Sequence, residues 1–284
     1  MRYEKPTTVE AATALLAGQG ARVLAGGTDL LVQLRSRVLS PDVVVDIKGI
    51  EETRRITKED GGYRIGAAVT GAELKEHPTL SKDWPGLVEG ANLIGSTQVQ
   101  GRATLGGNLC NGSPAADSVP GLIAAGAVAA IVGPNGKREL AVEDIMLAPR
   151  KLALTPGEFI VSFKLPAKAP KSSDAYLRFI PRTEMDIAVV GCGVSLTLDG
   201  SGTCTAARVA LGAVAARPLL VDDAAKALIG SKVDDEALTK LEAAARAACK
   251  PIDDKRGTIE FRIDIAGVLA RRTALIALER ARKA

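Results

Sequence analysis

The spacing of hydrophobic residues switches several times along the chain between the period of a helix and that of a strand. Helical spacing predicts helices over residues 9–18, 30–35, 86–94, 222–229 and 235–248, with two more that begin at 72 and 258. Short alternating or continuous apolar runs predict strands over residues 21–25, 43–47, 63–67, 127–132, 138–142, 160–165, 175–180, 187–198 and 203–212.

The order of these elements predicts two domains. Residues 21–47 give strand, turn, helix and strand, which is a βαβ unit of minimal length. The segment Pro166 to Ser173 has the composition of a linker. We therefore expect one domain over residues 1–170 and a second, α+β domain over residues 174–284, with three antiparallel strands followed by helices.

Residues 95–114 are rich in Gly, Ser, Thr and Asn, with few residues that define a core face. The sequence predicts a long loop here. Such a loop inside a compact domain is usually functional.

Composition excludes several classes of protein. With 284 residues, 46% of them hydrophobic, the chain has ample material for a buried core. Its 37 basic and 33 acidic residues give a net charge of only +4, spread too thinly for a nucleic-acid-binding surface. No apolar run reaches the roughly 18 residues of a membrane span, and the N-terminus does not resemble a signal peptide.

The metal-ligating residue types are few. Cys110, Cys192, Cys204 and Cys249 show no metal-binding spacing, and His77 is the only histidine. We expect no metal site within the chain, and four reduced thiols in a cytoplasmic protein.

No motif assembles a catalytic group. Gly133 to Lys137 lacks the spacing of a phosphate-binding loop and is expected to be a hairpin turn. Gly191 to Ser195 lies inside an apolar strand, which rules out both a nucleophile elbow and a dinucleotide fingerprint. We therefore assign no catalytic residue.

Two glycine-rich segments carry the chemical signal. In Ala25-Gly26-Gly27-Thr28-Asp29, the glycines leave backbone N–H groups at a strand-to-helix turn, an arrangement suited to a pyrophosphate. A tight turn that serves only packing is the alternative. The second segment, residues 102–117, combines two glycines with hydroxyl, amide and carboxylate groups.

These two segments, about 80 residues apart, resemble the FAD-binding medium subunits of the molybdenum hydroxylases, which include xanthine dehydrogenase and aerobic carbon monoxide dehydrogenase. The resemblance rests on Ala25 to Asp29, on Thr104-Leu105-Gly106-Gly107-Asn108, and on Ser113-Pro114 with Asp117. It extends over the whole chain through Tyr3 to Pro6, Thr155 to Glu158, Asp186-Ile187-Ala188 and Thr258 to Arg262.

The resemblance implies a fold like that of vanillyl-alcohol oxidase, with two FAD-binding subdomains, approximately residues 1–55 and 56–170, and a C-terminal antiparallel sheet with helices. It implies that FAD contacts Leu24, Ala25, Gly26, Gly27, Thr28, Asp29, Leu30, Thr104, Gly107, Asn108, Asp117, Ile160, Tyr176 and Arg178. Asp117 is expected at the adenosine part of FAD, and Tyr176 and Arg178 beside the isoalloxazine. Ile94 and Ile160 stand where the family places apolar groups against the rings, although ordinary core positions are the alternative for both.

The resemblance also implies a function. The chain is expected to carry electrons from the 2Fe-2S clusters of a small subunit, through FAD, to an external acceptor, while a large molybdopterin subunit oxidises the substrate. A dimer of such heterotrimers is the expected assembly. Two alternatives remain open at this point: a free-standing flavin oxidoreductase of the same fold, and a non-catalytic nucleotide-binding scaffold.

Overall fold

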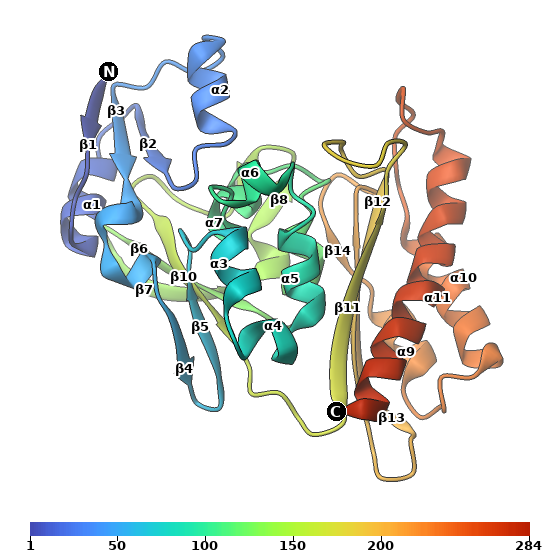
Figure 1. Ribbon diagram of the computed structural model, residues 1–284. Coiled ribbons are helices and arrows are strands. Elements are labelled where there is room, and N and C mark those ends of the chain that lie inside the picture. Colours follow the sequence, from blue (N-terminus) through green and yellow to red (C-terminus); the bar gives the residue numbers. More distant parts are fainter.

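A small parallel sheet forms the N-terminal end of the molecule. The computed structural model describes residues 1–284, and its first sheet has the strand order β1-β3-β2 (Figure 1). Its strands are β1 (Arg2–Glu4), β2 (Ala21–Leu24) and β3 (Val43–Asp46), and its helices are α1 (Val9–Leu16) and α2 (Leu30–Arg35). Strands β2 and β3 pair in parallel, which confirms the predicted βαβ unit. The sequence pattern did not reveal β1, which is only three residues long.

The second sheet is entirely antiparallel and has the order β4-β5-β10-β6-β7. Its strands are β4 (Ile56–Glu59), β5 (Gly62–Gly66), β6 (Val128–Gly133), β7 (Gly136–Ala141) and β10 (Phe159–Leu165). The predicted hairpin at Gly133 to Gly136 joins β6 to β7. The short strands β8 (Met146–Ala148) and β9 (Lys151–Leu152) follow, and they lead into β10.

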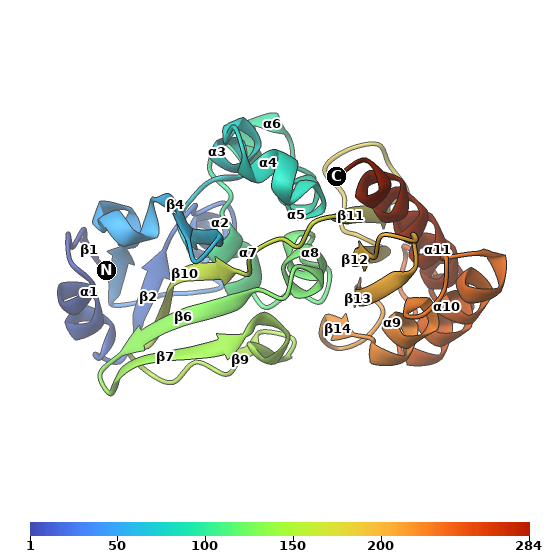
Figure 2. The same cartoon turned by 90° about the horizontal axis from the view of Figure 1, so that it is seen from below.

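A group of short helices lies between the second sheet and the C-terminal part of the chain (Figure 2). They are α3 (Gly71–Glu76), α4 (Leu80–Asp83), α5 (Pro85–Ala91), α6 (Thr97–Gln100), α7 (Leu105–Cys110) and α8 (Ser118–Ala124). Helices α6 and α7 correct the prediction of a continuous loop over residues 95–114. Both are too short to show a helical period in the sequence; α7 is capped by Thr104 and buries Leu105 and Leu109 in the core, whereas α6 has no side-chain cap.

The C-terminal sheet lies between two layers of helices (Figures 1 and 2). Its order is β11-β12-β13-β14, with β11 (Ser172–Phe179), β12 (Val190–Leu198), β13 (Cys204–Gly212) and β14 (Leu219–Leu220). Helices α5 and α8 pack on one face, while the other carries α9 (Asp222–Leu228), α10 (Asp235–Ala248) and α11 (Ile259–Lys283). The three predicted strands are present, and the two-residue β14 adds a fourth.

Three apolar clusters make up the core. One joins α1 to the central strands β3 and β10 of the first two sheets, one fills the space between the second sheet and helices α5 and α8, and one lies under α9 to α11. The first two clusters fix the segments that line the site described next. No helix has both the length and the apolar composition needed to cross a membrane.

Candidate cofactor site

A cavity of about 710 Å³ opens between the first sheet, helix α7 and the segment before β10. Both predicted glycine segments line it, although they are far apart in the sequence. Its volume falls in the range of about 300–1,000 Å³ that is usual for small-molecule and cofactor sites.

The first glycine segment supplies unpaired backbone donors. Gly27 adopts a left-handed conformation with φ of +80° and turns the chain from β2 into α2. The first N–H after this turn that donates within the protein is that of Leu31, which binds the Gly27 carbonyl over 3.0 Å. The N–H groups of residues 27–30 donate to no atom of the protein. Four successive free donors on the wall of a cavity are suited to an anion such as a pyrophosphate.

The two glycine segments touch each other directly. A Cβ atom on Gly26 would lie 2.0 Å from the carbonyl oxygen of Arg102, just before α7. A Cβ on Gly106 would lie 2.7 Å from the carbonyl oxygen of Ala67. A side chain at position 26 would therefore force the two glycine segments apart, and one at position 106 would push α7 away from the residue that follows β5.

The second glycine segment contributes shape more than free donors. The hydroxyl of Thr104 caps α7 by accepting from the N–H of Gly107 over 3.0 Å, and the N–H of Gly106 donates to the Ala67 carbonyl over 3.1 Å. The two ends of the Asn108 side-chain amide have different surroundings. Its Oδ1 accepts from the N–H and the hydroxyl of Ser118, over 3.1 and 2.7 Å, while its amide NH₂ has no partner in the protein.

Apolar side chains and one fixed carboxylate complete the lining. Ile94 and Ile160 both line the cavity, with Leu152 and Leu154 beside them. Glu158 also lines it and binds Arg138 over 2.6 Å, and this guanidinium lowers the pKa of Glu158 to about 2.

The wall formed by residues 150–159 was not predicted to be part of the site. The segment Thr155 to Glu158, which contributed to the family resemblance, could have indicated this wall, but we had assigned it no role in the site. The Glu158 carboxylate accepts from the N–H of Thr155 over 2.7 Å, which closes this turn beside the cavity.

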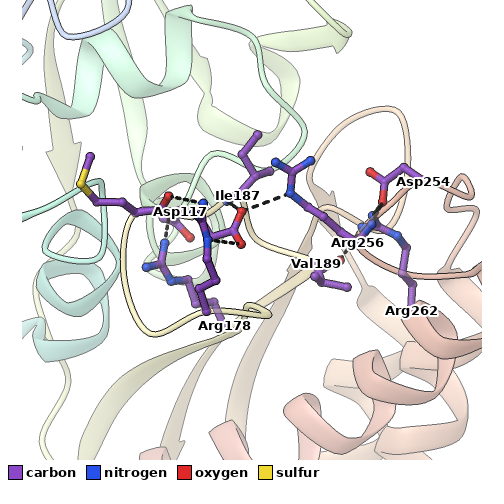
Figure 3. A network of polar contacts seen from close by, with 10 residues as sticks. Asp117, Arg178, Ile187, Val189, Asp254, Arg256 and Arg262 are labelled. Atoms are coloured by element: carbon purple, nitrogen blue, oxygen red, sulfur yellow. Dashed lines mark hydrogen bonds and ion pairs between the residues drawn. The ribbon is translucent and has the colours of Figure 1, made fainter.

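Four of the predicted contact residues do not line the cavity. Leu24 is 8% exposed and packs beneath the glycine turn. Asp117, Tyr176 and Arg178 form a separate cluster of buried side chains. Figure 3 shows the pair of Asp117 and Arg178. The Arg178 Nη1 donates to Asp117 Oδ2 over 2.8 Å, and the Tyr176 hydroxyl donates to Asp117 Oδ1 over 3.0 Å.

This cluster corrects one expectation. Asp117 was expected at the adenosine part of FAD and Arg178 beside the isoalloxazine. An ion pair holds the two side chains next to each other, so they cannot lie at opposite ends of the cofactor. Burial raises the pKa of Asp117 to about 6, and the charge of Arg178 opposes this rise.

Comparisons with known proteins identify the family of each part of the chain. The family described as the FAD binding domain in molybdopterin dehydrogenase matches residues 1–168, and the carbon monoxide dehydrogenase flavoprotein C-terminal domain matches residues 175–277.

Individual relatives match along nearly their whole length. The carbon monoxide dehydrogenase medium chain of Afipia carboxidovorans is 34% identical, over 99% of this chain and 96% of that protein. A putative xanthine dehydrogenase FAD-binding subunit of Escherichia coli is 31% identical over 95% of this chain and 93% of that protein. A chain of the crystal structure of Cu,Mo-CO dehydrogenase superimposes with a TM-score of 0.94 at 33% identity, covering 99% of this chain and 98% of that one.

The fold and the cavity define a flavoprotein with a mixed helix and sheet architecture. The chain belongs to the FAD-binding subunits of the molybdenum hydroxylase family, and its cofactor is FAD. The residues present fit that cofactor, because free N–H groups, a side-chain-free approach and an apolar wall meet in one cavity of suitable size.

Proposed function

We propose that this chain is the electron-exit subunit of a molybdenum hydroxylase complex. Electrons from the 2Fe-2S clusters of a small subunit enter its FAD and leave to an external acceptor, while a large molybdopterin subunit oxidises the substrate. FAD suits this position because it takes electrons singly from clusters and releases them in pairs.

The main observation behind this proposal is the cavity between the two glycine segments. In this proposal the N–H groups of residues 27–30 bind the pyrophosphate, and the Thr28 hydroxyl adds a further donor. The Asn108 NH₂ donates to the cofactor, and Ile94 and Ile160 exclude water from the ring system. The protein thus binds and orients FAD, whose own chemistry carries the electrons.

The names of the relatives support the proposal that this chain acts with partner subunits. "Medium chain" and "FAD-binding subunit" each describe one component among several. We propose a dimer of heterotrimers located in the cytoplasm, and a division of this chain into domains over residues 1–170 and 174–284. The connection between β10 and β11 is where this division falls.

Affinity purification through a tag on this chain from its native host tests the proposal. Flavin, iron and molybdenum should co-purify in fixed proportion with two further polypeptides. A lone homo-oligomer that oxidises a substrate with FAD but without iron or molybdenum would instead establish the free-standing oxidoreductase. A chain that takes up no flavin would point to the scaffold.

A further inference from the structure

We propose that Asp117, Tyr176 and Arg178 are positioning residues, through which the C-terminal sheet sets the orientation of Asn108 in the FAD cavity. This inference rests on the proposed function. It gives the three residues a role that does not require contact with FAD.

One polar face of strand β11 binds the neighbouring helices. Asp174, Tyr176 and Arg178 alternate along β11 and therefore point to the same side of the sheet. Tyr176 and Arg178 each bind one oxygen of Asp117, the residue that precedes α8. The side chains of Arg178 and Asp117 are only 5% and 10% exposed, so this ion pair is shielded from water.

The sheet is shaped to allow this approach. A Cβ on Gly191 would lie 2.6 Å from the Tyr176 hydroxyl, and a Cβ on Gly193 would lie 2.5 Å from the carbonyl oxygen of Pro120 in α8. These are the two glycines of the Gly191 to Ser195 segment, which no catalytic motif explained. They let α8 and the Tyr176 hydroxyl lie close against β12.

A short path of hydrogen bonds leads from the ion pair to the cavity. Asp117 is followed directly by Ser118, which is fully buried. Ser118 donates both its N–H and its hydroxyl to Asn108 Oδ1. Because two donors hold the carbonyl oxygen of this amide, its NH₂ is the half left for the cofactor. A shift of Asp117 would therefore turn the Asn108 amide.

Loss of one partner should cause such a shift. Removing Arg178 leaves a buried carboxylate without its counter-charge, and such a group relaxes toward water or takes up a proton. Either response changes the first turn of α8, and with it the Ser118 donors.

A double-mutant cycle on the assembled complex tests the path. FAD dissociation constants are measured for Arg178→Met, Asn108→Ala and the double variant. We expect each single change to weaken FAD binding about tenfold, and the double variant to bind FAD no more weakly than Asn108→Ala alone. Effects that multiply would show that Arg178 acts on FAD binding independently of Asn108, and would overturn the proposal.

Two further variants distinguish a specific effect on Asn108 from a general loss of stability. Arg208→Met breaks another ion pair between the C-terminal sheet and the first part of the chain, from β13 to Glu143 over 2.7 Å, and neither residue is hydrogen-bonded to Asp117, Ser118 or Asn108. It should change the FAD affinity less than about twofold at a comparable loss of stability. An equal loss of FAD affinity in Arg208→Met would contradict the proposal.

Tyr176→Phe removes a single hydroxyl and keeps the packing of the ring. It therefore replaces Arg178→Met in the double-mutant cycle if Arg178→Met does not fold. It should weaken FAD binding in the wild-type background and have no effect in the Asn108→Ala background. The opposite pattern would overturn the path. A complete failure of the wild-type complex to hold FAD would defeat the proposed function instead.

Discussion

Individual glycines in the cofactor segments serve different purposes. A Cβ on Gly26 would collide with a backbone carbonyl, whereas a Cβ on Gly107 would meet only the Thr104 hydroxyl, 2.9 Å away. The sequence left two explanations open for the first segment, a tight turn needed for packing and a pyrophosphate site. The structure supports the packing role for Gly26, and the free donors of Gly27 and the residues after it are the basis on which we propose the pyrophosphate site.

We predict that Gly26→Ala destabilises the fold even when FAD is absent. The methyl group would lie 2.0 Å from the Arg102 oxygen, and overpacking of this kind costs about 1–3 kcal/mol. Denaturant unfolding of the apoprotein measures the change. Gly200→Ala is the matched control, since a Cβ there meets nothing within 4 Å. Equal stability of the two variants without FAD would show that the packing argument is wrong.

At the scale of elements, the sequence predicted those with a clear period. The βαβ unit, the β6–β7 hairpin and α10 follow from regular apolar spacing. Helices α6 and α7 could not be predicted in this way, because four and six residues are too few to show a helical period. The glycine segments were found as motifs. The Asp117–Arg178 pair depends on how β11 faces α8, which no local pattern reveals.

Helix α5 shows a similar dependence on distant residues. Its own N-cap residue, Trp84, supplies no capping side chain. Asp174 on β11 caps it instead, accepting from the N–H of Leu87 over 2.9 Å. Asp174 is fully buried, and this burial raises its pKa from 3.8 to about 6.

We predict that Asp174 makes the fold less stable as the pH rises from about 4 to 6. The folded state holds the proton of Asp174 more tightly than the unfolded state does. Its contribution to stability is therefore fully present below pH 4, and each pH unit in this range removes about 1.4 kcal/mol. Asp174→Asn keeps an acceptor for Leu87 and cannot ionise, so its stability relative to wild type should rise over this range.

Urea unfolding at pH 4 and pH 6.5 measures that difference. Asp223→Asn, at an exposed carboxylate on α9, is the control and should show no comparable trend with pH. A constant difference between wild type and Asp174→Asn across the range would mean that the buried carboxyl ionises normally.

At the scale of the whole molecule, the cofactor cavity and its support come from different parts of the chain. Residues before β11 line the cavity, while β11 holds α5 and α8 by polar contacts from the C-terminal sheet. Polar contacts of this kind fix one relative arrangement more strictly than apolar packing, because each bond requires a particular distance and direction. The C-terminal sheet thus holds the helices next to the cavity without lining it.

The most direct test of the account is the Gly107→Val variant of the assembled complex. A branched side chain at this position displaces only the Thr104 hydroxyl, which would lie 2.9 Å from the added Cβ, and it occupies the approach to the cofactor. We predict a complex that keeps its iron and molybdenum, loses FAD and no longer delivers electrons to an external acceptor, while Gly200→Val retains all of these properties. A Gly107→Val complex with stoichiometric FAD, or one that reaches the acceptor at the wild-type rate without FAD, would contradict it.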